Sequence, residues 1–319
     1  MKRKIDVCQF SFFNALINFK RLKFNLIKYL TLIRINNWVK NIFIFIPLFF
    51  SSELLNSDKF ILTLLVSIAF SFVTSFVYII NDIFDIDFDK SHPDKKNRPL
   101  TSGIISIRNS LIIGLLLFLI GLITLCFFSF YSFLITIFYF IINVLYSYKL
   151  KHVAIIDFVV ISIGFVIRIV IGGIVGEIEL SQSIIVMVFL LSLFLAVSKR
   201  RDDVYQFELE NKINRKVVSK YTLEFMDKII TIVSSVLIVS YLLFITSEDV
   251  VLTYSSNHLL ITFIFVLLGV FRYNQLTYVY NKSGSPIKIL FNDVFLQIIL
   301  ICWTFTFFII IYLNQFING

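Results

Sequence analysis

The chain has 319 residues, of which 58% are hydrophobic and 15% are charged, and its mean hydropathy is +0.91. These values exclude an ordinary soluble domain and are typical of a protein that crosses a membrane several times. The net charge of +9 does not indicate a nucleic-acid partner, because the basic residues lie beside acidic ones next to apolar runs. Lipid headgroups and phosphorylated substrates account for such charge better. Cys8, Cys126 and Cys302 lack ligand spacing, so neither a disulfide nor a zinc site is predicted.

Residues 1–30 begin with a basic cluster and continue with a moderately apolar stretch, as a signal peptide does. Asp6, Asn14 and Asn18 interrupt the apolar part, however, and no small-residue cleavage site follows. We therefore predict an interfacial amphipathic helix on the inner leaflet. Residues 31–319 are expected to form one transmembrane domain.

Nine apolar runs follow in chain order, and several approach the roughly 20 residues that a helix needs to cross a bilayer. None alternates as a lipid-facing strand would, so an all-α membrane protein with nine transmembrane helices is predicted. The spacing of the two longest loops suggests two four-helix units plus a ninth helix. The runs are 32–52, 60–80, 110–129, 131–147, 153–175, 183–198, 229–246, 258–271 and 294–314.

The basic residues predict the orientation of these helices. If the N-terminus is inside, Lys59 alone lies outside and Arg168 lies within a span, which leaves 27 of the 29 Lys and Arg residues in or beside cytoplasmic segments. The positive-inside rule selects this arrangement. All clusters able to carry chemistry then face the cytoplasm.

The densest acidic segment, Asn81 to Asp89, comes at the end of the second apolar run. If the helix continues through it, Asp82, Asp85 and Asp89 share one face, while Asp87 points away. Hard oxygen ligands on one face suit Mg²⁺, which is usually bound by carboxylates together with substrate phosphates. The alternative is a solvated acidic loop.

A basic loop follows this acidic segment. His92, Lys95, Lys96 and Arg98 lie between two prolines or next to them, and the loop is able to fold back over a metal site. Arginine offers bidentate contacts to phosphate and lysine a point charge. A positive-inside loop without a ligand is the alternative.

Asp157 and Arg168 lie eleven residues apart in the fifth apolar run, on one helical face. A charged residue at the bilayer centre costs about 2.5–3.5 kcal/mol on translocon scales, so Arg168 is predicted to bind substrate. The alternative is a structural ion pair between the two side chains.

Two further groups of cations close inner ends of predicted helices. Lys149 and Lys151 end the fourth run, where they are either membrane anchors or substrate ligands. Segment 198–203 supplies three cations followed by Asp202 and Asp203, a combination able to hold a diphosphate oxygen and a second metal ion.

These residues together resemble the UbiA superfamily of intramembrane prenyltransferases, and within it the decaprenyl-phosphate phosphoribosyltransferase type. The acidic segment matches the first aspartate-rich motif of the superfamily. The second motif departs from it, because Asp203 is followed by Glu208 and no aspartate lies four residues on. The subfamily pattern continues in Arg34 with Trp38 to Asn41, His92-Pro93 to Gly103, Tyr146 to Lys151, Gly164 to Arg168, Ser198 to Arg200, Arg272-Tyr273, and Ser285 to Asp293.

The resemblance implies a catalytic domain that transfers 5-phosphoribose from phosphoribosyl diphosphate to a polyprenyl phosphate and releases diphosphate. Mg²⁺, or Mn²⁺ in its place, would be the cofactor, and the bacterial inner membrane the location. Precursors of cell wall or surface polysaccharide would be the products, and an oligomer is left open.

The residues implied in this reaction fall into three groups. Asp82 and Asp85 would be catalytic. Metal ligands would be Asn81, Asp82, Asp85, Asp89 and Asp203. Substrate would be bound by Lys40, Tyr78, Lys95, Arg98, Lys151, Arg168, Lys199 and Arg200. Two alternatives remain: a prenyltransferase that moves a polyprenyl group from its diphosphate to an aromatic or small acceptor, and a transporter or lipid-binding protein.

Overall fold

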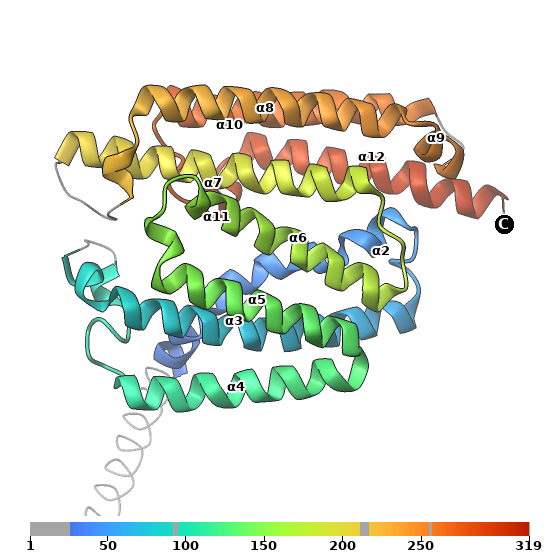
Figure 1. Ribbon diagram of the computed structural model, residues 1–319. Helices are drawn as coiled ribbons and strands as arrows, with labels where there is room; N and C mark the ends of the chain where they lie inside the picture. Colours follow the sequence, from blue (N-terminus) through green and yellow to red (C-terminus); the bar gives the residue numbers. More distant parts are fainter. Residues whose placement is uncertain (1–25, 92–94, 211–216, 255–256, 319) are drawn as a thin grey trace, which may run out of the picture.

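A computed structural model describes residues 26–91, 95–210, 217–254 and 257–318, and these segments contain helices and loops but no strand (Figure 1). The predicted all-α class is therefore confirmed. The amphipathic helix predicted over residues 1–30 lies almost wholly outside the described residues, of which 26–30 are helical.

Within the described residues, eight helices are long and apolar enough to cross a membrane, and they coincide with eight of the nine predicted runs. They are α3 (Ser57–Ser91), α4 (Ile107–Phe128), α5 (Phe130–Tyr148), α6 (Ile156–Gly176), α7 (Gln182–Glu210), α8 (Leu223–Thr246), α10 (Ile261–Tyr278) and α12 (Val294–Asn318). Shorter elements connect or precede them: η1 (Ile35–Phe45), α2 (Ile46–Phe50), η2 (Lys95–Asn97), η3 (Leu150–His152), η4 (Val218–Lys220), α9 (Glu248–Tyr254), η5 (Asn257–Leu260) and α11 (Pro286–Asn292).

The first predicted span, 32–52, differs from the others. The backbone of Arg34 is left-handed, with φ 52°. After this residue the segment forms the 3₁₀-helix η1, which is followed by the short helix α2. A 3₁₀-helix rises about 2.0 Å per residue against 1.5 Å in an α-helix, so the two elements together extend roughly 30 Å. That length is close to the roughly 30 Å thickness of a hydrocarbon core, although the segment is short for an α-helical span.

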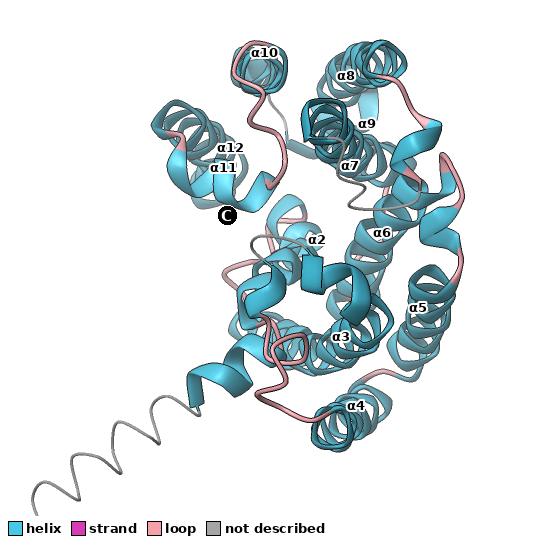
Figure 2. Ribbon diagram, turned by 90° about the vertical axis from the view of Figure 1, so that its left-hand side faces the viewer, coloured by secondary structure: helices cyan, strands magenta, loops and turns pink. Residues whose placement is uncertain are grey.

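Neighbouring helices in the chain pack against each other, η1 packs against α3 and α6, and α2 packs against α6. A first core joins α3 to α6, and a second joins α6, α7, α8 and α10. A third core brings α12 against α2, where the ring of Phe307 lies 5.3 Å from that of Phe50. Figure 2 shows the helices end-on with α2 among them. The predicted division into two four-helix units stays a prediction.

The close approach of η1 to α6 depends on Gly172. A Cβ atom at this position would stand 1.9 Å from the carbonyl oxygen of Ile44, closer than any atoms can pack. The absence of a side chain therefore lets η1 pack closely against α6, the helix that carries Arg168 of the predicted site.

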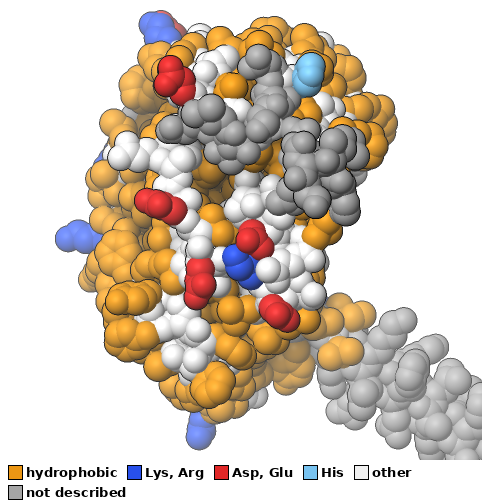
Figure 3. Space-filling model, turned by 90° about the vertical axis from the view of Figure 1, so that its right-hand side faces the viewer, with side chains coloured by type: hydrophobic (Ala, Val, Ile, Leu, Met, Phe, Trp, Pro, Cys, Tyr) orange, Lys and Arg blue, Asp and Glu red, His pale blue; other side chains and the backbone are white. Residues whose placement is uncertain are grey.

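The loops that follow α3, α5, α7 and α10 gather at one end of the bundle, on the left of Figure 1. The opposite end, seen in Figure 3, presents acidic side chains and few basic ones. Its described charges include the ion pair of Lys59 with Glu53, at 3.0 Å. The two polar clusters around Asp82 and Arg200, described next, lie toward the first end, whereas Arg168 lies within α6.

Candidate active site at the loop end of the bundle

Helix α3 continues through the acidic segment without a break, as the sequence predicts. Asp82 and Asp89 are buried, with 4% and 3% of their surface exposed, and Asp85 is half-buried. The side chain of Asp87 is 92% exposed and pairs only with Lys90, at 3.0 Å, among the contacts described. The shared face of three carboxylates is therefore confirmed, and the solvated-loop alternative is wrong for that face.

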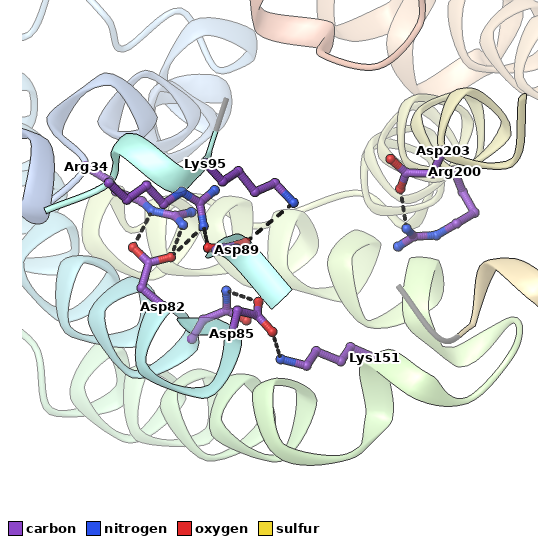
Figure 4. A network of polar contacts seen from close by, with 10 residues as sticks. Arg34, Asp82, Asp85, Asp89, Lys95, Lys151, Arg200 and Asp203 are labelled. Atoms are coloured by element: carbon purple, nitrogen blue, oxygen red, sulfur yellow. Dashed lines mark hydrogen bonds and ion pairs between the residues drawn. The ribbon is translucent and has the colours of Figure 1, made fainter. Parts of the chain in front are cut away.

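Four cations from three segments of the chain meet these carboxylates (Figure 4). Arg34, immediately before η1, contacts Asp82, to which its Nε donates over 3.2 Å. Arg98, after η2, bridges the two buried carboxylates: its Nη1 lies 2.9 Å from Asp82 and also contacts Asp89.

Lysines complete the arrangement. Lys95 approaches Asp89 at 3.9 Å, and Lys151, from η3, lies 2.6 Å from Asp85. Asn81 donates its side-chain amide to the second oxygen of Asp85 over 3.1 Å. The basic loop does fold back over the acids, as predicted. His92 lies outside the described residues.

The electrostatics of this cluster favour an additional anion. Burial and the neighbouring Arg34 both lower the pKa of Arg98 from its usual value, so two guanidinium groups are held together against their mutual repulsion. Buried charges are stable only when paired and hydrogen-bonded. A phosphate group would add acceptors for both guanidinium groups, in the bidentate geometry that arginine suits.

The metal ligands require a separate test. Within the described segments, no three His, Cys, Asp or Glu side chains converge on one point. Instead each carboxylate of the shared face contacts an ammonium or guanidinium group. The carboxylates that attract these positive charges would also attract a divalent cation. Three carboxylates and the amide oxygen of Asn81 are the hard donors that Mg²⁺ prefers, so the donor set fits this metal.

A second polar cluster lies at the end of α7, across the loop end from the first (Figure 4). The guanidinium of Arg200 is buried and donates its Nε to Asp157 over 2.6 Å, while its Nη1 contacts Asp203. Asp203 is half-buried and Lys199 is exposed. The structure thus brings Arg200 and Asp203 together and places them apart from the α3 carboxylates.

Arg168 does not pair with Asp157, so the structural ion pair considered for these two residues is wrong. The carboxylate of Asp157 is taken by Arg200 instead. The guanidinium of Arg168 donates its Nε to Asn41 over 2.8 Å, and it also contacts the carbonyl oxygen of Gly164 and the hydroxyl of Tyr139. Hydrogen bonds and aromatic rings, among them Phe70 at 5.3 Å, surround this buried cation.

Lys40 and Tyr78 lie between Arg168 and the α3 carboxylates. The ammonium of Lys40 stands 5.9 Å from the ring of Tyr78, whose centre is 5.0 Å from the guanidinium of Arg34. The ammonium of Lys40 is also close enough to Arg168 and Arg34 to be repelled by their positive charges. A row of cations therefore runs from the loop end into the bundle.

Sequence reasoning missed several parts of these clusters. Arg34 and Asn41 appear in the sequence analysis only within the family pattern, without a role, and Tyr221 does not appear there. No local signal distinguishes them, because their partners lie 48, 127 and 64 residues away in the chain. Arg272 and Asp293, also quoted in the pattern, join α10 to the start of α12 at 2.8 Å, and this contact lowers the pKa of Asp293.

Comparison with known proteins supports the family resemblance expected from the sequence. The model of the UbiA prenyltransferase family matches residues 42–299. The chain is 27% identical to a decaprenyl-phosphate phosphoribosyltransferase of Mycolicibacterium smegmatis, over 88% of this chain and 92% of the relative. It is 26% identical to the enzyme of that name from Corynebacterium glutamicum, over 88% and 86%.

The fold is shared with solved structures. A UbiA homolog from Archaeoglobus fulgidus, bound to GPP and Mg²⁺, superposes with a TM-score of 0.68 and 20% identity, covering 89% of this chain and 99% of that one. The family match spans most of the chain, the helical bundle is the one seen in solved members, and the acidic face of α3 lies at the loop end of that bundle. The chain therefore belongs to the UbiA prenyltransferase family.

Proposed function

We propose that this protein transfers 5-phosphoribose from phosphoribosyl diphosphate to a polyprenyl phosphate and releases diphosphate. The observation that carries the proposal is the buried face of Asp82, Asp85 and Asp89 with Arg34 and Arg98 folded over it. Such a site suits a metal-bound diphosphate. Relatives that match nearly the whole chain bear the name of this activity, and the second Asp-x-x-x-Asp motif of ordinary prenyltransferases is absent.

The reaction requires little from the protein beyond binding and charge stabilisation. An oxygen of the lipid phosphate attacks C1 of the ribose, the bond from C1 to the diphosphate oxygen breaks, and diphosphate leaves with the electron pair. The acceptor is already an anion, so no general base is needed. Positioning and neutralisation of the leaving group are the main contributions.

Asn81, Asp82, Asp85 and Asp89 would hold Mg²⁺, with Mn²⁺ as a substitute, and Asp203 on α7, which lies apart from them, would be a ligand of a second metal ion. The metal would stabilise the charge that develops on the departing diphosphate. Asp82 and Asp85 are assigned as catalytic on this basis.

The cations of the site would bind the phosphate groups of both substrates. Lys95, Arg98, Lys199 and Arg200 would clamp the diphosphate from two sides of the loop end. Lys151 at the loop end, together with Lys40 and Arg168 deeper in the bundle, would bind the 5-phosphate or the acceptor phosphate, beside the ring of Tyr78. The lipid tail would leave between helices, which accounts for a site within a membrane protein.

The protein is a multi-pass membrane protein, and its location in the bacterial inner membrane with the N-terminus and site in the cytoplasm is part of the proposal. The gathering of the basic loops at one end supports this orientation. The η1–α2 segment would make the ninth crossing. Precursors of cell wall or surface polysaccharide would be the products.

A prenyltransferase remains the second candidate, because the fold is shared with a UbiA homolog bound to GPP. Membranes that contain the protein, supplied in parallel with labelled phosphoribosyl diphosphate or labelled prenyl diphosphate, separate the two. Label from the ribose entering a lipid phosphate supports the proposal. Label only from the prenyl donor entering a small acceptor contradicts it. A transporter is disfavoured because both charged clusters lie at one end.

A further inference from the structure

The segment between α5 and α6 carries Lys151 on a strained backbone. Ile155 has φ 71° and ψ −49°, near the geometry of a γ-turn that is rare and strained, and it is β-branched. Such a conformation persists only where the surrounding structure over-determines it. Contacts from outside the segment must therefore hold it in place.

Those contacts come from the chain between α7 and α8. Tyr221, which follows η4 and is 6% exposed, accepts a hydrogen bond from the amide of Ile155 over 2.6 Å. Its neighbour Lys220 donates to the carbonyl oxygen of His152 over 3.2 Å. Two adjacent residues thus clamp both ends of a short loop, whose Lys151 reaches Asp85 of α3.

The same tyrosine hydroxyl also orients the second polar cluster. It donates to Oδ1 of Asp157 over 2.7 Å, and Oδ2 of Asp157 accepts the Nε of Arg200 over 2.6 Å. Asp157 is fully buried. Because both of its oxygens are engaged, the plane of the carboxylate is set, and with it the direction of the Arg200 guanidinium.

We propose that Tyr221 and Asp157 are positioning residues, which fix Lys151 and Arg200 relative to each other so that both cations face the phosphates of one substrate. The inference rests on the proposed function in one respect, that these cations bind phosphate. Neither Tyr221 nor Asp157 touches the substrate. Each acts through a hydrogen bond to the part of the chain that does.

The test uses Tyr221→Phe, which removes one oxygen and keeps the ring. Tyr241→Phe is the matched control, since Tyr241 is also 6% exposed and its hydroxyl also has two hydrogen-bond partners, in this case the side chains of Thr262 and Trp303. Asp157→Asn gives a second variant of the network, so that the failure of one variant to fold leaves the other to carry the test.

Two measurements are made on purified protein in detergent or nanodiscs. Hydrogen exchange should become faster at the amides of residues 149–155 in Tyr221→Phe and stay as in the parent in Tyr241→Phe. The KM for phosphoribosyl diphosphate should rise by roughly 10- to 100-fold, the range found when a group that orients a ligand is removed, with a smaller change in kcat. Asp157→Asn should likewise raise the KM for phosphoribosyl diphosphate more than it changes kcat.

Unchanged exchange at 149–155 would overturn the proposed clamp. Faster exchange with a KM no different from that of Tyr241→Phe would make the network structural and overturn the positioning role. If the parent protein transfers no phosphoribose, the proposed function fails, while the exchange measurement still decides whether Tyr221 holds the loop.

Discussion

At the scale of single residues, exposure separates the acids of one short segment. Asp82, Asp85 and Asp89 pair with cations from other parts of the chain, whereas the side chain of Asp87 is exposed to solvent. The helical period alone predicts this separation. It cannot predict which cation meets which carboxylate, because those partners come from distant parts of the chain.

Asp85→Ala should lower kcat/KM by about 10²-fold or more, because it removes a hard-cation ligand and leaves the buried ammonium of Lys151 unpaired. Asp87→Ala, the matched control, should stay within about twofold, as surface substitutions do. Activity is measured over a series of Mg²⁺ and Mn²⁺ concentrations. Equal losses in the two variants would contradict the assignment of the shared face.

Arg168→Lys should weaken binding of the substrate phosphate that Arg168 holds, because an ammonium keeps the charge but loses the planar fork. A charge-assisted hydrogen bond is worth about 1.5–3 kcal/mol, so the KM for either phosphoribosyl diphosphate or polyprenyl phosphate should rise by roughly 10-fold or more. The unfolding temperature is measured alongside. A folded variant with the parental KM for both substrates would show that Arg168 serves only the contacts with Asn41 and Tyr139.

The paired variant Arg168→Leu with Asp157→Leu tests the same residue from another side. It should not restore activity, because Asp157 pairs with Arg200 and its removal takes away the buried one of the two carboxylates that this guanidinium contacts. Recovery of transfer in the double variant would mean that Asp157 and Arg168 act as a pair after all.

At the scale of elements, close packing explains where the irregular first segment sits. η1 rests on α6 at Gly172, and α2 meets α12 through aromatic rings. Hydropathy identifies this segment as apolar but gives no indication that it forms a 3₁₀-helix. Its conformation follows from tertiary contacts, which local propensity does not contain.

Gly172→Ala should destabilise the protein by about 1–3 kcal/mol or more, because the new methyl group meets the backbone of η1 and cannot be accommodated by a side-chain rotation. Gly269→Ala is the control, since its nearest neighbour would be the side chain of Ile299 at an ordinary 3.7 Å. Helix propensity favours alanine by up to about 1 kcal/mol there, so the control should be neutral or more stable. Thermal unfolding of the two variants, compared with the parent, tests this. A neutral Gly172→Ala would show that η1 can move away from α6.

At the scale of the whole molecule, the distribution of charge predicts the orientation. Basic residues are frequent in the loops that follow α3, α5 and α7, which gather at one end of the bundle (Figure 1), and the other end presents mainly acids (Figure 3). The proposed site lies at the basic end, where soluble phosphorylated substrates would be met in the cytoplasm.

Single cysteines placed in a variant without the three native ones test this orientation. Lys282→Cys, in the exposed loop after α10, should react with a membrane-permeant thiol reagent but not with an impermeant one added outside the cell. Glu177→Cys, exposed after α6, should react with both. Labelling of the two positions from the same side would mean that a crossing has been miscounted.

The sequence by itself determined the membrane class, eight of the spans, the acidic face of α3 and the family, because hydropathy, helical period and motif spacing are properties of neighbouring residues. Tertiary structure decided the rest. It paired Asp157 with Arg200 rather than with Arg168, brought Arg34 to Asp82 across 48 residues, and placed the Tyr221 hydroxyl against the start of α6. Buried charges and hydroxyls must find partners somewhere in the fold, but only the packing of the helices decides which partners come within reach.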